Sequence, residues 1–393
     1  MTAPDEPLPH PDRNPAPAGL YIHIPFCVAK CGYCSFTSYP CGTAPPAGYL
    51  AAVQSQAERM AAHPLVDGRR FSTLFVGGGT PTVFPGEELG QLIRACLDLY
   101  DFTPEAEITV EANPNSIDQA KLAALKKAGV NRLSIGVQSF SDRLLKGIGR
   151  LHSRDEAITA VQLARAAGFA NLNLDLIYGL PEQTRSHWRE TMESALALAP
   201  EHLALYCLTV EEGTPFADLA HRHQLPLPDE ETVLAMEGEG YGLLARAGYE
   251  RYEISNFALP GRRSRHNENY WHNGNYLGLG AAAVSCLDHL RFRQVEDPAL
   301  FASQVQAGQL PLLDLEGLPP AMAFRETVIM GLRLLDGVSI PELEQRFGIT
   351  PRAYYGPILA PLLARGLVSM DDQRLRLTAK ALPVANQVLA ELV

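Results

Sequence analysis

The sequence predicts an α/β fold, in which six βα units form a partial, TIM-like barrel and a small winged-helix-like domain follows at the C-terminal end. Between residue 20 and about residue 210, short β-branched runs alternate with amphipathic helical patterns, which is typical of parallel βαβ units. Unusual polar residues fall late in these runs, where the catalytic groups of a βα barrel gather. Because six units are too few to close an eightfold barrel, we expect one side to be open.

The six predicted strands are short and largely apolar. In chain order they are YIHIPF (21–26), TLFVGGG (73–79), EITVEAN (107–113), RLSIGVQSF (132–140), LNLDLIYGL (172–180) and LALYCLTV (203–210). Amphipathic stretches between them predict helices, among them 49–63, 88–100 and 116–129. Crossover connections of this kind are right-handed, which makes the sheet curl toward a barrel.

Beyond the sixth unit, a helical pattern leads into a polar, aromatic stretch over 266–286. The composition changes near 307–320, which indicates a linker. Helical patterns then precede an Asp371-Asp372 turn between two short extended runs, which predicts a hairpin. The predicted organisation is a disordered leader over 1–18, a barrel with its extension over 19–306, a linker over 307–320 and a winged-helix-like domain over 321–393.

The composition is that of a soluble globular protein. Of 393 residues, 46% are hydrophobic and 20% are charged, and 44 acidic against 33 basic side chains give a formal charge of −11. This charge repels phosphate backbones, so nucleic acid is not expected as a partner. No apolar run reaches the roughly 18–20 residues that cross a bilayer, and the N-terminal stretch lacks the basic start and apolar core of a secretory signal. We expect a cytoplasmic protein without a transmembrane segment.

Three of the seven cysteines, Cys27, Cys31 and Cys34, lie within eight residues, in the stretch YIHIPFCVAKCGYCSF (21–36). Three thiols at these spacings can converge on one ion or cluster. A structural zinc site takes four ligands, usually in C-x-x-C pairs, and no second pair exists in this sequence. An iron–sulfur cluster normally takes four thiolates, so three would leave one iron open to a small chelating molecule. The odd, uneven cysteine set also argues against a secreted disulfide framework.

This cysteine motif resembles the cluster motif of the radical S-adenosylmethionine (SAM) superfamily. The resemblance implies a radical SAM barrel in which Cys27, Cys31 and Cys34 hold a 4Fe–4S cluster. It also implies that the amino and carboxylate groups of SAM chelate the fourth iron. One electron from the cluster would then cleave SAM to methionine and a 5′-deoxyadenosyl radical.

Further motifs agree with a SAM site. GGGTPT (77–82) follows the second predicted strand and is similar to the superfamily motif that meets the SAM amino group. Alone, a glycine run is equally typical of a tight turn, and a lone acid is typical of a helix cap; their shared position at strand ends favours ligands. The residues that the resemblance implies at the SAM site are Tyr21, Gly78, Gly79, Thr80, Glu111, Gln138, Arg150, Asp175 and Thr209.

Almost the whole chain further resembles the oxygen-independent coproporphyrinogen III oxidase group, through YIHIPFC, FVGGGTPT, LSIGVQSF, DLIYGLPEQT, YEISNFA and GLVSMDDQRLRLT. That group contains a true oxidase and a related haem chaperone. The oxidase has a further cysteine two positions after the third cluster cysteine, where this chain has Phe36. It also has a longer N-terminal segment, whereas 26 residues precede Cys27 here. Both departures favour the chaperone.

HNENYW, from His266 to Trp271, is similar to the H-N-x-x-Y-W motif of the chaperone. Imidazole is a usual axial ligand of haem iron, and aromatic side chains can lie against a porphyrin face. The alternative is a polar loop packed on the barrel, in which His266 bonds a backbone carbonyl. With the resemblance, we expect His266 to bind haem.

The sequence therefore predicts a haem chaperone that carries a 4Fe–4S cluster and SAM and hands haem to an acceptor haemoprotein, such as a respiratory enzyme at the membrane. The cluster and SAM would support formation of a homodimer or transfer of haem. The alternative is the oxidase reaction, in which propionates of coproporphyrinogen III are oxidatively decarboxylated to give protoporphyrinogen IX. A third hypothesis, a nucleic-acid-modifying radical enzyme, is disfavoured by the acidic charge. No role is predicted for Cys41, Cys96, Cys207 and Cys286 beyond a core position for Cys96.

Overall fold

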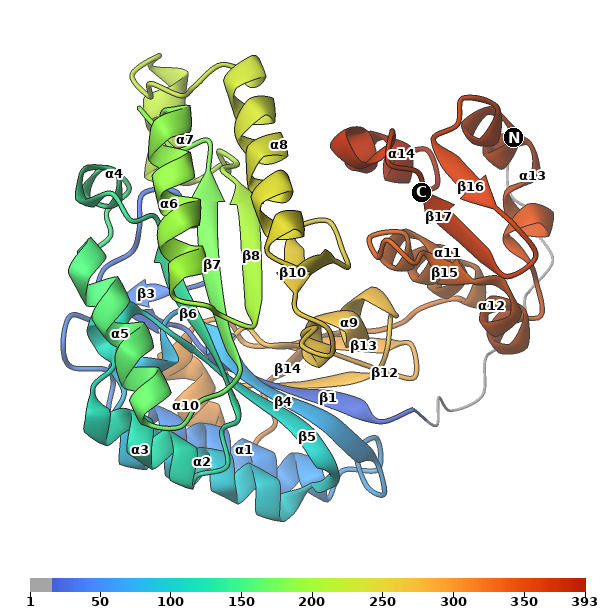
Figure 1. Ribbon diagram of the computed structural model, residues 1–393. Helices are drawn as coiled ribbons and strands as arrows, with labels where there is room; N and C mark the ends of the chain where they lie inside the picture. The colour runs from blue at the N-terminus through green and yellow to red at the C-terminus, as the bar shows by residue number, and fades with distance from the viewer. Residues whose placement is uncertain (1–15) are drawn as a thin grey trace.

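The computed structural model describes residues 16–393, and its main body is a twelve-stranded mixed sheet that curves into an open barrel (Figure 1). Six neighbouring parallel strands in chain order form its centre, which confirms the prediction of six βα units. These strands are β1 (Ala18–Ile24), β4 (Arg70–Gly78), β5 (Asp101–Ala112), β6 (Arg132–Gln138), β7 (Leu172–Tyr178) and β8 (His202–Cys207).

The helices that connect these strands cover the outer face of the sheet (Figure 1). They are α1 (Tyr49–Ala61), α2 (Gly86–Leu99), α3 (Gln119–Lys127), α5 (Arg154–Ala166) and α6 (Arg185–Ala197). The short helix α4 (Asp142–Gly147) lies in the connection after β6, and its Leu144 belongs to a separate small hydrophobic cluster. Side chains alternate along a strand, so one set packs against the helices and the other faces the barrel interior. On β6, Leu133 and Ile135 belong to the main hydrophobic core, whereas Arg132 and Ser134 line an interior cavity.

The sheet extends beyond the central strands on both sides. Next to β1 lies the parallel strand β11 (Tyr276–Leu279), followed by the antiparallel strands β12 (Val284–Leu287), β13 (Leu290–Gln294) and β14 (Leu312–Gly317). At the other edge, β10 (Asn256–Ala258) and β9 (Glu250–Arg251) run antiparallel. Strand β14 lies inside 307–320, where the composition indicates a linker. It is an exposed edge strand with no buried side, so its sequence lacks the apolar alternation of a half-buried strand.

Short elements complete the barrel. Strands β2 (Phe26–Cys27) and β3 (Tyr39–Pro40) frame the cysteine loop. The remaining pieces are η1 (Pro81–Val83), η2 (Pro114–Ser116), α7 (Pro215–His221), α8 (Glu230–Arg246), α9 (Arg265–Trp271) and α10 (Pro298–Gln306). Helix α9 contacts β1 and β4. It places the HNENYW motif against the barrel strands as a helix, in place of the loop that the sequence offered as an alternative.

Residues between Leu318 and Leu392 build a second hydrophobic core. The order of helix, strand, two helices and hairpin confirms the predicted winged-helix-like arrangement, and the hairpin turns at Asp371 and Asp372. Helix α13 kinks at Gly356, directly before Pro357. The elements are α11 (Pro320–Gly331), β15 (Val338–Ser339), α12 (Ile340–Phe347), α13 (Pro351–Ala364), β16 (Val368–Met370), β17 (Arg374–Leu377), η3 (Leu382–Val384) and α14 (Ala385–Ala390).

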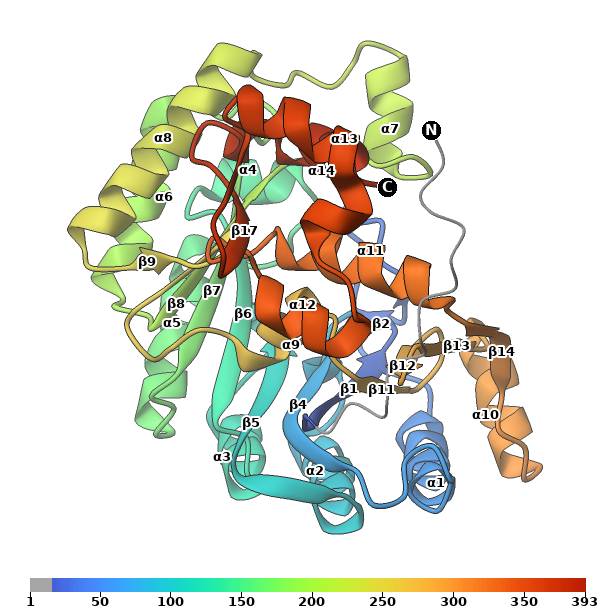
Figure 2. The ribbon, with the colours of Figure 1, turned by 90° about the vertical axis from the view of Figure 1, so that its right-hand side faces the viewer.

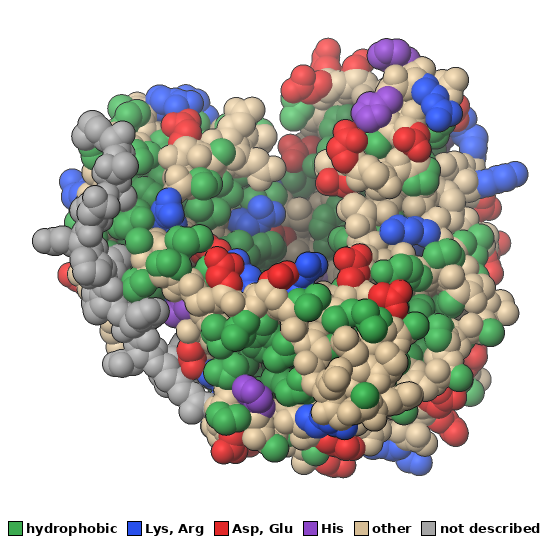
Figure 3. Space-filling view, turned by 180° about the vertical axis from the view of Figure 1, so that it is seen from behind, with side chains coloured by type: hydrophobic (Ala, Val, Ile, Leu, Met, Phe, Trp, Pro, Cys, Tyr) green, Lys and Arg blue, Asp and Glu red, His purple; other side chains and the backbone are tan. Residues whose placement is uncertain are grey.

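The winged-helix-like part lies in front of the barrel when the molecule is seen from the side (Figure 2). The Leu335 N–H donates a hydrogen bond to the carbonyl oxygen of Tyr252 at 3.0 Å, and Glu253 forms an isolated β-bridge with Leu334. Seen from behind, a notch separates this part from the lobe that carries α7 and α8 (Figure 3). The cavity at the notch is lined by α8 and by residues 382–387.

The predicted leader, 1–18, is only partly covered, because residues 1–15 lie outside the described residues and β1 already begins at Ala18. None of the helices within residues 16–393 combines the length and the apolar composition that crossing a bilayer requires.

Candidate functional site

The cysteine motif lies on the loop that follows β1, at the C-terminal ends of the barrel strands. Cys27, Cys31 and Cys34 are all free and partly buried. Thr80 Oγ1 donates a hydrogen bond to Cys27 Sγ at 3.5 Å, and Arg150 Nη1 lies 3.9 Å from Cys31 Sγ. The loop is therefore held against the strands that follow it in the barrel.

The three cysteine thiols lie close enough to influence one another electrostatically. Within residues 16–393, no group of three or more His, Cys, Asp or Glu side chains is arranged to hold a metal ion. In an iron–sulfur cluster each thiolate binds its own iron, so the thiols need not meet at one point. Burial raises the pKa of the Cys34 thiol, a hydrogen bond with the Phe36 backbone opposes the rise, and the nearby Cys31 and Cys27 add to it. A cationic iron centre would relieve this mutual repulsion between thiolates.

Two glycines allow the next loop to lie directly beside the cysteine loop. Gly78 has φ of 112°, and a Cβ at this position would lie 2.4 Å from the His23 ring. A Cβ on Gly79 would lie 2.6 Å from the carbonyl oxygen of Phe26. The same carbonyl accepts a hydrogen bond from the Thr80 N–H at 2.8 Å. Only glycine permits this approach of the two backbones.

A chain of hydrogen bonds connects Arg150, through Asn113 and Thr80, to Cys27. Arg150 Nη2 donates to Asn113 Oδ1 at 2.7 Å and also to the Gly136 carbonyl oxygen. Asn113 Nδ2 donates to Thr80 Oγ1 at 2.9 Å, and Thr80 in turn donates to Cys27. The Arg150 Nε is buried and has no partner among residues 16–393, which leaves one donor for a ligand.

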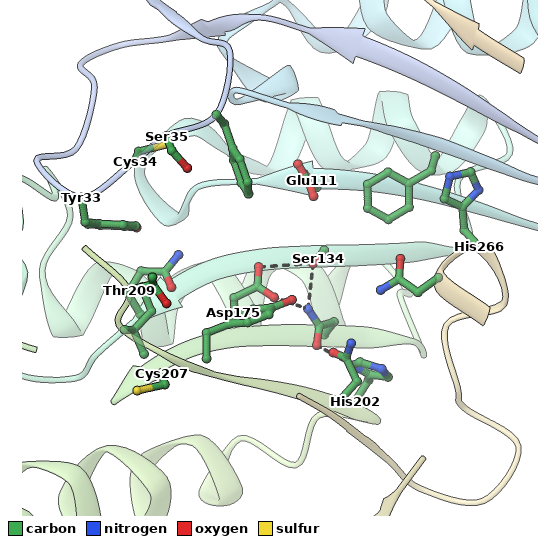
Figure 4. Close-up of a pocket in the computed structure, with 18 of the residues that line it drawn as sticks. Tyr33, Cys34, Ser35, Glu111, Ser134, Asp175, His202, Cys207, Thr209 and His266 are labelled. Atoms are coloured by element: carbon green, nitrogen blue, oxygen red, sulfur yellow. Dashed lines mark hydrogen bonds between the residues drawn. The ribbon is translucent and has the colours of Figure 1, made fainter. Parts of the chain in front are cut away.

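Two acidic side chains, Glu111 and Asp175, line the interior cavity of the barrel between Cys34 and His266 (Figure 4). Burial raises the pKa of Glu111 to about 7; Asp175 adds to the rise, and the Gly78 N–H and Arg132 oppose it. Burial also raises the pKa of Asp175, which a hydrogen bond from Asn173 Nδ2 at 2.8 Å opposes. Both carboxyl groups are therefore acceptors that hydroxyl or amino groups of a ligand would satisfy.

Gln138 occupies a strained position at the end of β6. Its φ is 65°, in the left-handed region, and the pairing of β6 with β7 is irregular between Gly136 and Gln138. Such a bulge redirects the side chain, and a non-glycine residue in this region costs about 1 kcal/mol or more. Strain of this kind is found where a side chain is needed in a particular place.

Most of the predicted site residues meet in one small cavity of about 130 Å³ beside the cysteine loop. They are Cys27, Cys31, Cys34, Gly78, Gly79, Thr80, Glu111, Gln138, Arg150 and Asp175. A larger cavity of about 480 Å³ continues into the barrel interior and contains the other three, Tyr21, Thr209 and His266. In Figure 4, Cys34 lies toward one end of this larger cavity and His266 lies at the other, with Glu111 and Asp175 between them.

His266 is buried on α9 at the inner end of the larger cavity. Its Nδ1 lies 2.7 Å from Thr73 Oγ1 and its Nε2 lies 3.1 Å from the Tyr270 hydroxyl, and its ring stacks on Phe75. The alternative of a bond to a backbone carbonyl is not found, because both ring partners are side chains. Burial, with a contribution from Arg132, lowers the pKa of His266 to about 3. The imidazole is neutral, which is the form that ligates metals.

Sequence reasoning missed several polar residues of the two cavities, because it searched for unusual residues at strand ends. Asn113 lies just past the end of β5, two positions after Glu111 and therefore on the same side of the chain. The other residues that were not predicted lie deeper in the barrel, at alternate positions of the central strands. The period of two along each strand is the sequence signal that could have located them. They are Arg132, Ser134, Asn173 and His202.

Residues 21–195 match the family model of the radical SAM superfamily, and residues 318–384 match that of the HemN C-terminal domain. A solved structure, coproporphyrinogen III oxidase (HemN) from Escherichia coli, superposes with a TM-score of 0.84 at 26% identity. The match covers 97% of this chain and 91% of that chain, and that protein is described as a radical SAM enzyme.

Curated relatives named "Heme chaperone HemW" match over most of their length. The chain is 34% identical over 372 residues to the Lactococcus lactis protein, covering 95% of this chain and 96% of the relative. It is 35% identical over 369 residues to the Bacillus subtilis protein, covering 94% and 97%. It is 40% identical over 268 residues to the Escherichia coli protein, covering 68% and 69%. The chain therefore belongs to the HemW family of the radical SAM superfamily.

Proposed function

We propose that this protein is a haem chaperone, which binds haem in the larger barrel cavity and passes it to an acceptor haemoprotein. The observation that carries the proposal is this cavity of about 480 Å³, with aromatic walls and a buried neutral histidine at its inner end. Its volume is in the range of about 300–1,000 Å³ that is typical of small-molecule sites. The name shared by the relatives supports the same function.

The small cavity and the adjoining part of the larger one would hold the cofactors. Cys27, Cys31 and Cys34 would bind a 4Fe–4S cluster, and SAM would lie between them and the strand ends. When bound, the cluster supplies an electron for the cleavage of SAM. The chain itself contributes close backbone approach at Gly78, Gly79 and Thr80, carboxyl acceptors at Glu111 and Asp175, the free Arg150 Nε, and flanking contacts from Tyr21, Gln138 and Thr209.

His266 would ligate the haem iron through Nε2. That nitrogen is engaged with the Tyr270 hydroxyl, so the hydroxyl has to turn away when the iron arrives. The Thr73 hydroxyl would then accept a hydrogen bond from Nδ1 and orient the ring. Thr209 lies at the outer end of the cavity and is exposed, so a haem bound here would be within reach of an acceptor. We also propose that the acceptor is a respiratory enzyme, that the protein is located in the cytoplasm and that it forms a homodimer.

The second candidate is the oxidation of coproporphyrinogen III. It is favoured by the whole-chain similarity to the oxidase structure. Phe36 is evidence against this second candidate. Its side chain is 68% exposed and lines both cavities two residues beyond Cys34. By the resemblance of the cysteine motif, the oxidase would have a further cysteine at this position.

The test uses anaerobically purified protein with a reconstituted cluster. Haem is titrated by visible absorption into wild type, His266→Ala and, as a matched control, His202→Ala. His202 is also buried in the cavity wall with both ring nitrogens bonded, at 2.6 Å to Asn173 Oδ1 and 2.8 Å to the Tyr252 hydroxyl. The same preparation receives SAM, a reductant and coproporphyrinogen III.

We expect stoichiometric haem binding that weakens in His266→Ala and persists in His202→Ala, with no porphyrin product. Formation of protoporphyrinogen that requires SAM and Cys27, without retention of haem, would establish the oxidase instead. Equal losses in both histidine variants would remove His266 as the ligand.

A further inference from the structure

Arg132 is a buried cation without a counter-ion. It begins β6, its exposed fraction is 2%, and it lines the larger cavity. Across residues 16–393, no hydrogen bond or ion pair engages its guanidinium group, and its Nε is buried without a partner. The nearby acids Glu111 and Asp175 sense its charge, but neither lies within ion-pair distance.

Two other arginines of the interior have hydrogen-bond partners for their guanidinium groups, a carboxylate for Arg69 and two neutral oxygens for Arg150. Arg69, which is 8% exposed, forms an ion pair with Asp288 and donates to the Leu65 carbonyl oxygen at 2.5 Å. Arg150 is bonded to Asn113 and to Gly136. A guanidinium group stays protonated in a protein, so burial without an anion is costly. The fold therefore keeps at this place a charge that an incoming anion would neutralise.

The residues of the cavity wall indicate which chemical class of anion would bind beside Arg132. Its walls carry Tyr21, Phe75 and Tyr270, which suit a flat apolar ligand. The planar fork of an arginine matches a carboxylate with two parallel hydrogen bonds. A ligand with a large aromatic body and a carboxylate on a short arm satisfies both features at once.

We propose that Arg132 binds a carboxylate of the ligand that fills the larger cavity and that, in haem binding, it takes one propionate. This inference rests on the proposed haem-binding function. The methionine carboxylate of SAM is the other possible source of the group. The SAM carboxylate would lie at the cluster, where Arg150 is already 3.9 Å from Cys31 Sγ. Arg132, in contrast, lines only the larger cavity, which it shares with His266, so the porphyrin is favoured.

The test compares haem with its dimethyl ester, in which both propionates are masked, in one aqueous–organic mixture. The proteins are wild type, Arg132→Met, Arg132→Lys and the control Arg69→Met, which also loses a buried arginine but away from the cavity. Visible titration gives porphyrin affinities, equilibrium dialysis gives SAM affinity, and thermal unfolding and iron content verify that each variant is folded.

We expect wild type to bind haem about 10- to 100-fold more tightly than the ester, as a charge-assisted hydrogen-bonded pair implies. Arg132→Met brings haem to the affinity of the ester and leaves the ester and SAM unchanged. Arg132→Lys recovers part of the difference. Arg69→Met lowers the unfolding temperature and leaves the ratio of the two affinities unchanged.

Several outcomes would overturn the inference. Equal losses for haem and ester in Arg132→Met would mean that the residue shapes the cavity without binding a carboxylate. Loss of SAM affinity with haem affinity intact would assign the carboxylate to SAM. Wild type that binds both porphyrins equally would leave haem binding standing and refute the role of Arg132. Wild type that binds neither would refute the proposed function itself.

Discussion

The backbone N–H of Gly78 donates a hydrogen bond to Glu111 Oε2 at 3.1 Å. This bond joins the loop that contains Gly78 and Gly79 to a carboxyl group of the small cavity beside the cysteines. It favours the charged form of that carboxyl group. Burial favours the neutral form and outweighs it, so the pKa of Glu111 is raised to about 7. Glu111 consequently changes protonation near neutral pH in the ligand-free protein.

Glu111→Gln should make the ligand-free protein more stable at pH 8, and the gain in stability should be much smaller at pH 5. The folded pKa of about 7 exceeds the unfolded value of about 4.3, so the folded state binds the extra proton between these values. Stability therefore falls as the pH rises from about 4.3 to 7 and then levels off. The ionised Glu111 lowers the free energy of unfolding by at most about 4 kcal/mol, from a pKa difference of about 2.7. Thermal unfolding at the two pH values measures it.

Glu107→Gln is the matched control on the same strand. Glu107 accepts hydrogen bonds from the backbone N–H groups of Arg265 and His266, at 3.1 Å and 3.2 Å. Both of its oxygens therefore accept a hydrogen bond, and the amide group of a glutamine would turn an N–H toward one of these donors, so the glutamine should destabilise the protein at pH 8. A gain in stability at pH 8 for both variants, or for neither, would contradict the role given to the burial of Glu111.

Gln138→Gly should raise stability while it weakens SAM binding. Glycine adopts a φ of 65° without strain, which is worth about 1 kcal/mol, but it lacks the side chain that lines both cavities. Gln138→Ala keeps the strained backbone and loses the same side chain. We expect equal losses of SAM affinity in the two variants and a higher unfolding temperature only in the glycine variant. Unchanged SAM affinity in both would remove Gln138 from the site.

Gly78→Ala should disturb the site, whereas Gly147→Ala should not. An alanine Cβ at Gly78 would meet the His23 ring at 2.4 Å in a backbone with φ of 112°, so the loop has to move. Gly147 ends α4 with nothing within 4 Å of an added Cβ. We expect a loss of about 1–3 kcal/mol and of SAM affinity for the first variant, by thermal unfolding and dialysis. Normal SAM binding in Gly78→Ala would show that the loop is not part of the site.

The central strands and the residues at their ends were predictable from sequence because two simple signals coincide there. Apolar β-branched runs mark each strand, and polar residues such as Glu111 and Gln138 interrupt them at the end where a βα barrel builds its site. The period of two also places alternate residues on the interior side. Arg132 was not predicted as a site residue, because a lone arginine at the start of a strand carries no sign of lacking a partner.

Several elements outside the six central units escaped prediction, and two of them show the physical reasons. Helix α9 has seven residues and is rich in Asn, Tyr and Trp, which have modest helix propensity; its formation depends on the Ser264 cap and on packing against the barrel. Strand β14 pairs at the edge of the sheet with both faces largely exposed, so it has no apolar alternation. In both cases tertiary contacts decide the structure, and a local pattern does not report them.

Replacing the cysteines one at a time tests whether three thiolates bind the cluster and leave one iron without a protein ligand. Cys27→Ser, Cys31→Ser and Cys34→Ser should each lower the iron content of the reconstituted protein several-fold, because each removes one of three thiolates. Cys41 is the matched control. It is partly buried close to the motif, and its N–H donates to the carbonyl oxygen of Cys27 at 2.8 Å. Cys41→Ser should keep iron and SAM binding, measured by iron assay and dialysis. Loss of iron in Cys41→Ser would instead make Cys41 a fourth ligand, which would close the iron that three thiolates leave open to SAM.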